Sequence, residues 1–198
     1  QQTQKSKSQA VGDDETNLAA KQELEAIKHS LHDDETASQL SIDEVTNEDG
    51  STSYQVVVQG DAQAFGESSP TAALVGEAIS SSKTIEFGFG STTETKETGG
   101  GNSRITINPE QACRMAGGVL QTVDTMTQHE FGHGVGIAQG KQVGRPTYST
   151  DAGTNPEGLA AENTARNWYV YKARQQYGSG SVAARSARRV YGEPRATH

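Results

Sequence analysis

The chain has 198 residues, 32% of them hydrophobic, which suits one compact core and leaves too little for a second large domain. Its longest apolar runs, such as residues 56–58, are far shorter than the roughly 20 residues of a membrane-spanning helix, so we expect no membrane span. The net charge of −8 arises in residues 1–50, with 12 acidic and 4 basic residues, whereas residues 51–198 carry 13 of each. This balance gives no indication of a nucleic-acid partner.

The N-terminal segment has the composition of a linker. Residues 1–16 are rich in Gln, Ser, Lys and acidic residues, with little to bury. Ala20, Leu24, Ile27 and Leu31 then follow a helical spacing, which predicts a short amphipathic helix. We therefore expect residues 1–49 to be an acidic linker with one amphipathic helix. Residues 50–198 should form the main domain, which ends in a solvated basic tail.

The main domain is predicted to be of the α+β class, with a small, mainly antiparallel sheet above an active-site helix and a glutamate helix that closes the site. A Pro that follows Ser69 marks a helix start, and a polar stretch ending in residues 99–101 is expected to be a flexible connection. The expected elements are a strand at 54–58, a helix from 70 to about 80, strands at 84–90 and 104–108, and helices near 118–138 and 156–176.

Residues 129–133 read H-E-F-G-H, a match to the H-E-x-x-H motif. In a helix, His129 and His133 lie one turn apart on one face, so both imidazoles can converge on a single Zn²⁺. Glu130 lies beside them, where it can take a proton from the water that zinc activates. Apolar residues surround the motif, and a purely structural role would have to explain three buried polar side chains. The sequence therefore predicts a catalytic zinc centre.

A catalytic zinc needs a third protein ligand and one open position. Gln139 stands where metzincins have their last histidine, but a neutral amide is a poor ligand, and both methionines precede the motif, so a Met-turn is missing. Two glutamates compete for the role. Glu157 fits a capping box with Thr154, whereas Glu162 lies near the buried face of its helix without another evident task. We expect Glu162 to be the third ligand and keep Glu157 as the alternative.

The H-E-F-G-H segment together with Glu162, Asn163 and Arg166 resembles the zincin metallopeptidases of bacterial effectors and polymorphic toxins, over roughly residues 70–175. It also resembles the catalytic domain of anthrax lethal factor, although the two glutamates here are five rather than four residues apart. A chain that starts without Met, with an acidic segment before a zincin, looks like the toxin extension of a type VI secretion spike protein of the VgrG kind.

The resemblance implies a secreted effector that hydrolyses peptide bonds of a protein or peptide substrate in the periplasm of a target cell. An immunity protein and the parent secretion spike are the partners it implies. It also implies a tyrosine that stabilises the oxyanion shortly before the third ligand. Tyr148 lies in the corresponding loop, with Tyr169 and Tyr171 as alternatives. Asn163 and Arg166 are candidates for orienting a metal ligand.

A second hypothesis is a non-catalytic binding module or cargo adaptor, in which the metal is structural or absent. Glu130 discriminates between the two hypotheses, because a structural metal site has no need of a general base.

Overall fold

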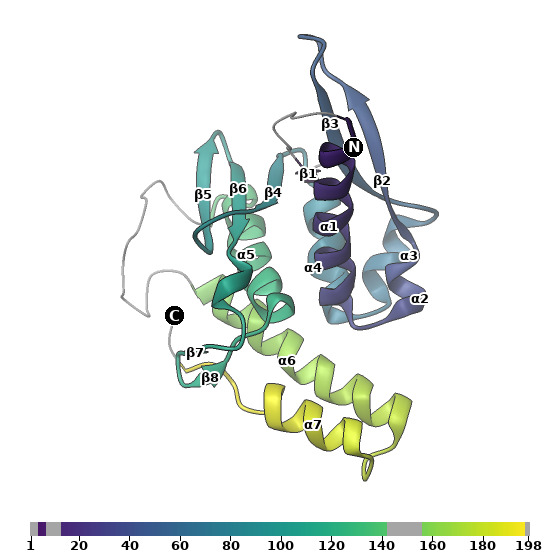
Figure 1. Cartoon of the computed structure of the whole chain (residues 1–198), viewed down its shortest axis with the longest axis vertical. Helices are drawn as coiled ribbons and strands as arrows, with labels where there is room; N and C mark the ends of the chain where they lie inside the picture. The colour runs from purple at the N-terminus through teal and green to yellow at the C-terminus, as the bar shows by residue number, and fades with distance from the viewer. Residues whose placement is uncertain (1–3, 7–12, 142–155, 197–198) are drawn as a thin grey trace.

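A computed structural model describes residues 4–6, 13–141 and 156–196 (Figure 1). The elements are, in chain order, β1 (Gln4–Ser6), α1 (Asp13–Leu31), α2 (Asp34–Ala37), β2 (Leu40–Thr46), β3 (Thr52–Val58), α3 (Ala62–Glu67), α4 (Pro70–Ser80), β4 (Ile85–Phe89), β5 (Glu94–Gly99), β6 (Asn102–Ile107), a 3-10 turn (Pro109–Gln111), β7 (Met115–Ala116), β8 (Val119–Leu120), α5 (Val123–Ala138), α6 (Pro156–Tyr177) and α7 (Val182–Tyr191).

A mixed six-stranded sheet forms one side of the fold, with the strand order β2-β3-β1-β4-β6-β5. Strand β4 runs parallel to β1 and to β6, whereas the β1–β3, β2–β3 and β5–β6 pairs are antiparallel. Strands β7 and β8 form a separate antiparallel pair. The α+β class is confirmed, and most of the described strand pairs are antiparallel as expected, although β4 runs parallel to both of its neighbours.

Strand β5 occupies the stretch that was expected to be a flexible connection. Its residues are polar and half-buried or exposed, and Lys96 pairs with Glu94 at 2.8 Å. The strand lies at the edge of the sheet and pairs with β6 alone among the described strands. Strand β5 therefore lacks the alternation of apolar and polar residues by which a half-buried strand is recognised in a sequence. Charged side chains are common on such edge strands.

Helix α5 lies at the centre of the molecule, where it packs against β5, β6, α1, α4 and α6 (Figure 1). Thr122 caps the N-terminus of α5. Its hydroxyl accepts a hydrogen bond from the backbone N–H of Thr125, and the Thr125 hydroxyl accepts one from the backbone N–H of Thr122. Met126, Phe131 and Val135 join the main hydrophobic core. The motif thus lies on a helix that is covered on several sides.

The N-terminal segment belongs to the same core, contrary to the expected linker. The predicted amphipathic helix forms as α1, and its Leu24, Ile27 and Leu31 are buried with residues of α4, α5 and the sheet. Strand β2 pairs with β3 along its whole length. The apolar face of α1 can be buried only against the other elements, so no domain boundary separates residues 17–49 from the rest.

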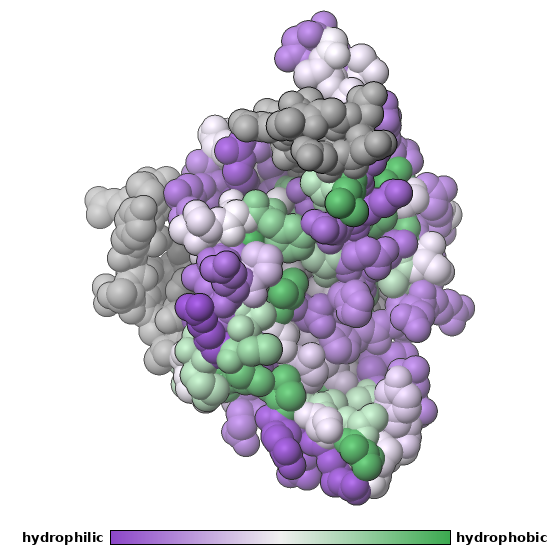
Figure 2. Space-filling view, viewed as in Figure 1, coloured by the Kyte–Doolittle hydropathy of each residue, from purple (hydrophilic) through white to green (hydrophobic). Residues whose placement is uncertain are grey.

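The predicted basic tail includes a further helix, α7, which packs on α6. None of the helices in the described ranges combines the length and the apolar character needed to cross a bilayer. On the face seen in Figure 2, hydrophobic residues occur in several separate groups among hydrophilic ones. The chain therefore presents a largely polar surface in this view.

Glu23 of α1 is a buried carboxyl group, 5% exposed, whose Oε2 atom has no hydrogen-bond partner. Burial raises the pKa of Glu23 from 4.5 to about 8, because an apolar environment disfavours the charged form. This carboxyl group binds a proton more tightly in the folded chain than in the unfolded chain. Its contribution to stability is therefore complete below pH 4.5 and is lost as the pH rises through about 8.

We predict that Glu23→Gln stabilises the protein at pH 8.5 by about 1–3 kcal/mol, the scale of burying one unsatisfied polar group, and changes little at pH 5. Urea unfolding at both pH values measures the effect. Glu25→Gln, on the exposed face of the same helix, is the control and should behave as the wild type. An identical pH dependence in wild type and Glu23→Gln would contradict the prediction.

Candidate metal centre

The side chains of His129 and His133 meet on one face of α5. Their Nε2 atoms are 3.1 Å apart, and the two side chains are 3% and 5% exposed. Two nitrogens on a tetrahedral zinc at 2.0–2.1 Å each are about 3.3 Å apart, close to the separation seen here. The imidazoles therefore have the spacing of two ligands on one metal ion.

Gly158 allows the backbone of α6 to lie close to both Nε2 atoms. A Cβ atom on residue 158 would lie against Nε2 of His133 and 2.8 Å from Nε2 of His129. On α5, a Cβ atom on Gly132 would lie 2.5 Å from the carbonyl oxygen of Glu157, so the two helices approach closely at these glycines. The two imidazoles have the spacing of two Zn²⁺ ligands, and a glycine at position 158 avoids a collision with either of them.

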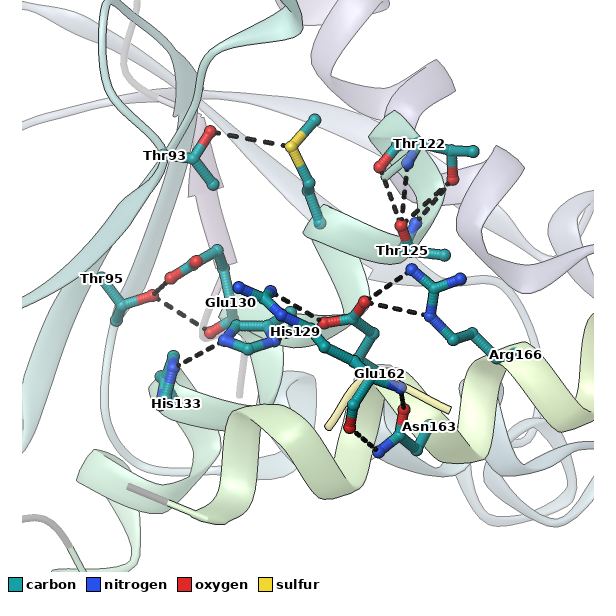
Figure 3. Close-up of polar contacts among 12 residues, drawn as sticks. Thr93, Thr95, Thr122, Thr125, His129, Glu130, His133, Glu162, Asn163 and Arg166 are labelled. Atoms are coloured by element: carbon teal, nitrogen blue, oxygen red, sulfur yellow. Dashed lines mark hydrogen bonds and ion pairs between the residues drawn. The ribbon is translucent and has the colours of Figure 1, made fainter. Parts of the chain in front are cut away.

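Glu130 points toward the edge strand β5 (Figure 3). Its Oε2 atom accepts a hydrogen bond from the hydroxyl of Thr95 at 2.6 Å, and the residue is 6% exposed. Burial raises the pKa of Glu130, and the nearby His129 and the Thr95 hydrogen bond oppose that rise only in part. Glu130 is therefore a stronger base than an exposed glutamate, and Thr95 holds one of its two oxygens.

Glu162 is fully buried and contacts the other nitrogen of His129 (Figure 3). Its Oε2 atom is 2.7 Å from Nδ1 of His129 and 3.1 Å from Nη1 of Arg195. Its Oε1 atom accepts hydrogen bonds from Nε and Nη2 of Arg166, at 3.0 and 2.7 Å. Burial alone would raise the pKa of Glu162, but these partners outweigh it and lower the pKa to about 2.

This geometry corrects the expected role of Glu162 as the third ligand. The Nδ1 and Nε2 atoms lie on opposite sides of the imidazole ring, so a carboxylate bound to Nδ1 of His129 cannot reach an ion held at Nε2. The position of Glu162 is instead that of a carboxylate that orients a metal-bound histidine. The sequence pattern predicted that Glu162 lies near the buried face of its helix. It could not indicate which nitrogen of His129 Glu162 contacts.

Asn163 holds the chain segment that follows α7. Its Oδ1 atom accepts from the backbone N–H of Arg195 at 2.7 Å, and its Nδ2 atom donates to the carbonyl oxygen of Arg195 at 3.1 Å. Sequence reasoning missed Arg195, because an arginine in a basic tail is usually solvated. It also missed Thr95 and Gly158, although a glycine in the first turn of a predicted helix could have pointed to a close approach.

The tyrosine expected to stabilise an oxyanion, Tyr148, lies outside the described residues. Tyr169 is 1% exposed, and its hydroxyl donates to the carbonyl oxygen of Ser30 at 2.8 Å. The half-exposed ring of Tyr171 packs on Trp168, with ring centroids 5.3 Å apart. Both alternative tyrosines thus have contacts away from the histidine pair.

Within residues 4–6, 13–141 and 156–196, no three His, Cys, Asp or Glu side chains form a ready metal site. Gln139, the residue at the metzincin position, ends α5 in an exposed position and donates to Glu77 of α4 at 3.3 Å. Glu157 is half-buried in the first turn of α6 and directly precedes Gly158. It is therefore the described carboxylate that stands next in sequence to the close approach of α6 to both imidazoles.

A pocket of about 310 Å³ lies between α4, α5 and α6. Its wall is mainly apolar and includes Leu74, Val135 and Ala161, with Glu157 also contributing. Neither histidine lines it. The pocket is therefore separate from the space between the two imidazoles.

Comparison with known proteins finds no matching family model, and no curated protein or solved structure is significantly similar to the chain. The chemistry of the centre must therefore be inferred from its own residues.

We predict that Gly158→Ala abolishes zinc binding, because the added methyl group would collide with the Nε2 atoms of both histidines. It should also destabilise the fold by about 1–3 kcal/mol through overpacking. Metal analysis after dialysis and circular dichroism separate the two effects. Gly180→Ala is the matched control, since a Cβ atom there meets nothing within 4 Å. A folded Gly158→Ala protein with a full complement of zinc would refute the assignment.

Proposed function

We propose that the chain is a zinc-dependent peptide hydrolase of the zincin type, with its metal held by His129 and His133. The main support is the buried pair of Nε2 atoms, 3.1 Å apart, against which Gly158 leaves no room for a side chain, next to the buried Glu130. When bound there, zinc would supply Lewis-acid chemistry, which polarises the scissile carbonyl group and favours the deprotonation of water.

Glu130 is the proposed general base. Its raised pKa suits a carboxylate that takes a proton from water and then passes it to the leaving amine. The Thr95 hydroxyl binds Oε2 and leaves Oε1 to receive the proton. Because β5 and α5 position these two residues independently, the carboxylate is held in place before substrate arrives.

Glu162 is proposed to fix the tautomer of His129. A neutral imidazole that donates its Nδ1 proton to Glu162 has a free electron pair on Nε2, which is the form that binds a metal. His129 and, after it, the two arginines keep the carboxylate ionised, as its pKa of about 2 indicates. Glu162 therefore remains an acceptor throughout a catalytic cycle.

The edge strand β5 is the proposed surface for the substrate backbone. It pairs with β6 on one side, and no described strand pairs with its other side. An extended peptide can add to such an edge through main-chain hydrogen bonds. The contact between Thr95 and Glu130 places the base next to this strand. A peptide bound along β5 would thus lie beside the general base.

Glu157 is the proposed third metal ligand. Glu162 is already bound by His129, Arg166 and Arg195, whereas Glu157 directly precedes the residue that borders both Nε2 atoms. Two imidazoles and one carboxylate form a known catalytic zinc set that leaves a position open.

Glu157→Gln should therefore lose zinc at chelator concentrations that the wild type tolerates. Glu162→Gln should keep zinc with roughly 10–100-fold weaker affinity, as is typical when the partner of a ligating histidine is removed. Competition with a chromogenic chelator measures both affinities. Unchanged affinity in Glu157→Gln would place the third ligand elsewhere.

Glu130→Gln should retain zinc and lower the rate of peptide cleavage by at least ~100-fold, because it removes the general base and no ligand. His133→Ala should instead lose the metal. Cleavage of a peptide library, read by mass spectrometry, and zinc content measured on the same samples test the two variants. Glu25→Gln, an exposed substitution on α1, is the control. Cleavage that survives in Glu130→Gln would overturn the proposed chemistry.

The resemblance to effector zincins supports the proposal that the hydrolase is a secreted antibacterial toxin that acts in the periplasm. The same variant tests this proposal in cells. When fused to an export signal, the wild-type chain should reduce bacterial growth, and Glu130→Gln should not. Equal growth with both chains would argue against a toxin.

One observation favours the non-catalytic alternative, in which the metal is structural or absent. The described residues supply two metal ligands in place and no third. A structural site would bind zinc in wild type and Glu130→Gln alike, with no cleavage by either protein.

A further inference from the structure

The chain segment after α7 returns to the metal centre and is fixed there at two points. The side-chain amide of Asn163 pairs with both backbone groups of Arg195, at 2.7 and 3.1 Å. The backbone N–H of Ala196 donates to the carbonyl oxygen of Gly117, at 3.2 Å. The tail is thus bound to α6 and to the turn between β7 and β8.

This attachment directs the side chain of Arg195 inward. The side chain is 10% exposed, and its Nη1 atom lies 3.1 Å from Oε2 of Glu162. The same oxygen atom accepts from Nδ1 of His129 at 2.7 Å. Among the described residues, His129 and Arg195 are the groups that contact Oε2, whereas Arg166 contacts Oε1.

We propose that Arg195 is a positioning residue that holds Oε2 of Glu162 on Nδ1 of His129, so that the C-terminal tail is an integral part of the metal centre. The inference rests on the proposed function in one respect. Fixing the proton of His129 on Nδ1 matters for activity only if the electron pair of Nε2 binds a metal. The positioning itself is a property of the metal-free chain and can be measured there.

The geometry of the two arginines explains why the second one is needed. Arg166 also donates to the carbonyl oxygens of Leu120 and Val190, so its position is fixed by the backbone, and it binds the carboxylate through one oxygen. A carboxylate held at Oε1 alone can still rotate its other oxygen. Arg195 restrains that rotation, because a charge-assisted hydrogen bond at Oε2 is directional.

Asn163 reduces the entropic cost of this contact. A free arginine side chain loses rotamer freedom when it is fixed. An arginine on an unattached tail would also have to fix its backbone. With the backbone of Arg195 bound by the Asn163 amide, only the side chain remains to be ordered. Asn163 therefore acts through Arg195 and not by contact with the histidine.

The test is long-range ¹H–¹⁵N NMR of the imidazoles in the full, metal-free chain, with His129 assigned by His129→Gln. The wild type should show His129 with its proton on Nδ1. Arg195→Gln should reduce the ratio of the Nδ1–H to the Nε2–H tautomer by roughly tenfold, the lower end of the effects seen when a partner of a ligating histidine is removed. Arg195→Lys, which keeps the positive charge and a hydrogen-bond donor group, should lower the tautomer ratio less than Arg195→Gln does.

Two further variants separate positioning from general charge and from loss of fold. Asn163→Ala keeps every charged group and should lower the tautomer ratio as Arg195→Gln does, with no additional loss in the double variant. Arg189→Gln removes an exposed arginine of α7 and should match the wild type. Thermal unfolding of each protein verifies that it is folded. If Arg195→Gln fails to fold, Asn163→Ala decides the proposal.

A wild-type ratio in folded Arg195→Gln, or in folded Asn163→Ala, would overturn the proposal, and so would an equal loss in Arg189→Gln. Zinc titration of the wild type tests the proposed function separately. A chain that binds no zinc but whose His129 responds to Arg195→Gln would refute the hydrolase and retain the positioning role.

Discussion

The buried carboxylate of Glu162 is the constraint on which the C-terminal half of the structure depends. An ionised carboxylate without water is tolerated only with charged or hydrogen-bonded partners. Here the partners come from α5, from α6 itself and from the tail, as His129, Arg166 and Arg195. Arg166 in turn binds carbonyl oxygens of β8 and α7. Compensation of one charge therefore connects β8, α5, α6, α7 and the tail.

The close approach of α5 and α6 makes this arrangement possible and has a cost in local stability. A glycine inside a helix disfavours it by about 1 kcal/mol relative to alanine. Gly132 on α5 and Gly158 on α6 nevertheless lie where a side chain would collide with the facing helix or with the imidazoles. Local helix propensity and the geometry of the centre are in conflict at these positions, as is common at functional sites. Tertiary packing around α5, which is buried from Thr125 to Ile137, overrides the local preference.

Sequence patterns were sufficient for elements with a clear period or a clear cap, and for the motif itself. The apolar spacing of α1, the Ser69 cap of α4 and the H-E-x-x-H segment of α5 all depend on residues close together in the chain. Strand β5 was missed because an exposed edge strand has no apolar alternation. The contact between Arg195 and Glu162 spans 33 residues and follows no period, so no local pattern could indicate it. The role of Glu162 depends on which imidazole nitrogen it meets, and helix periodicity does not determine that.

The two buried glutamates of the centre differ in the partners that oppose the effect of burial, and this difference supports the roles proposed for them. Burial by itself would raise the pKa of both carboxyl groups. At Glu130 the direct hydrogen-bond donor is the neutral hydroxyl of Thr95, and the pKa remains raised. At Glu162, His129 and then two guanidinium groups outweigh burial and lower the pKa to about 2. A proton released from water near His129 would therefore be accepted by Glu130 and not by Glu162. Opposite shifts in neighbouring carboxyl groups are the usual means by which one becomes a base and the other a permanent anion.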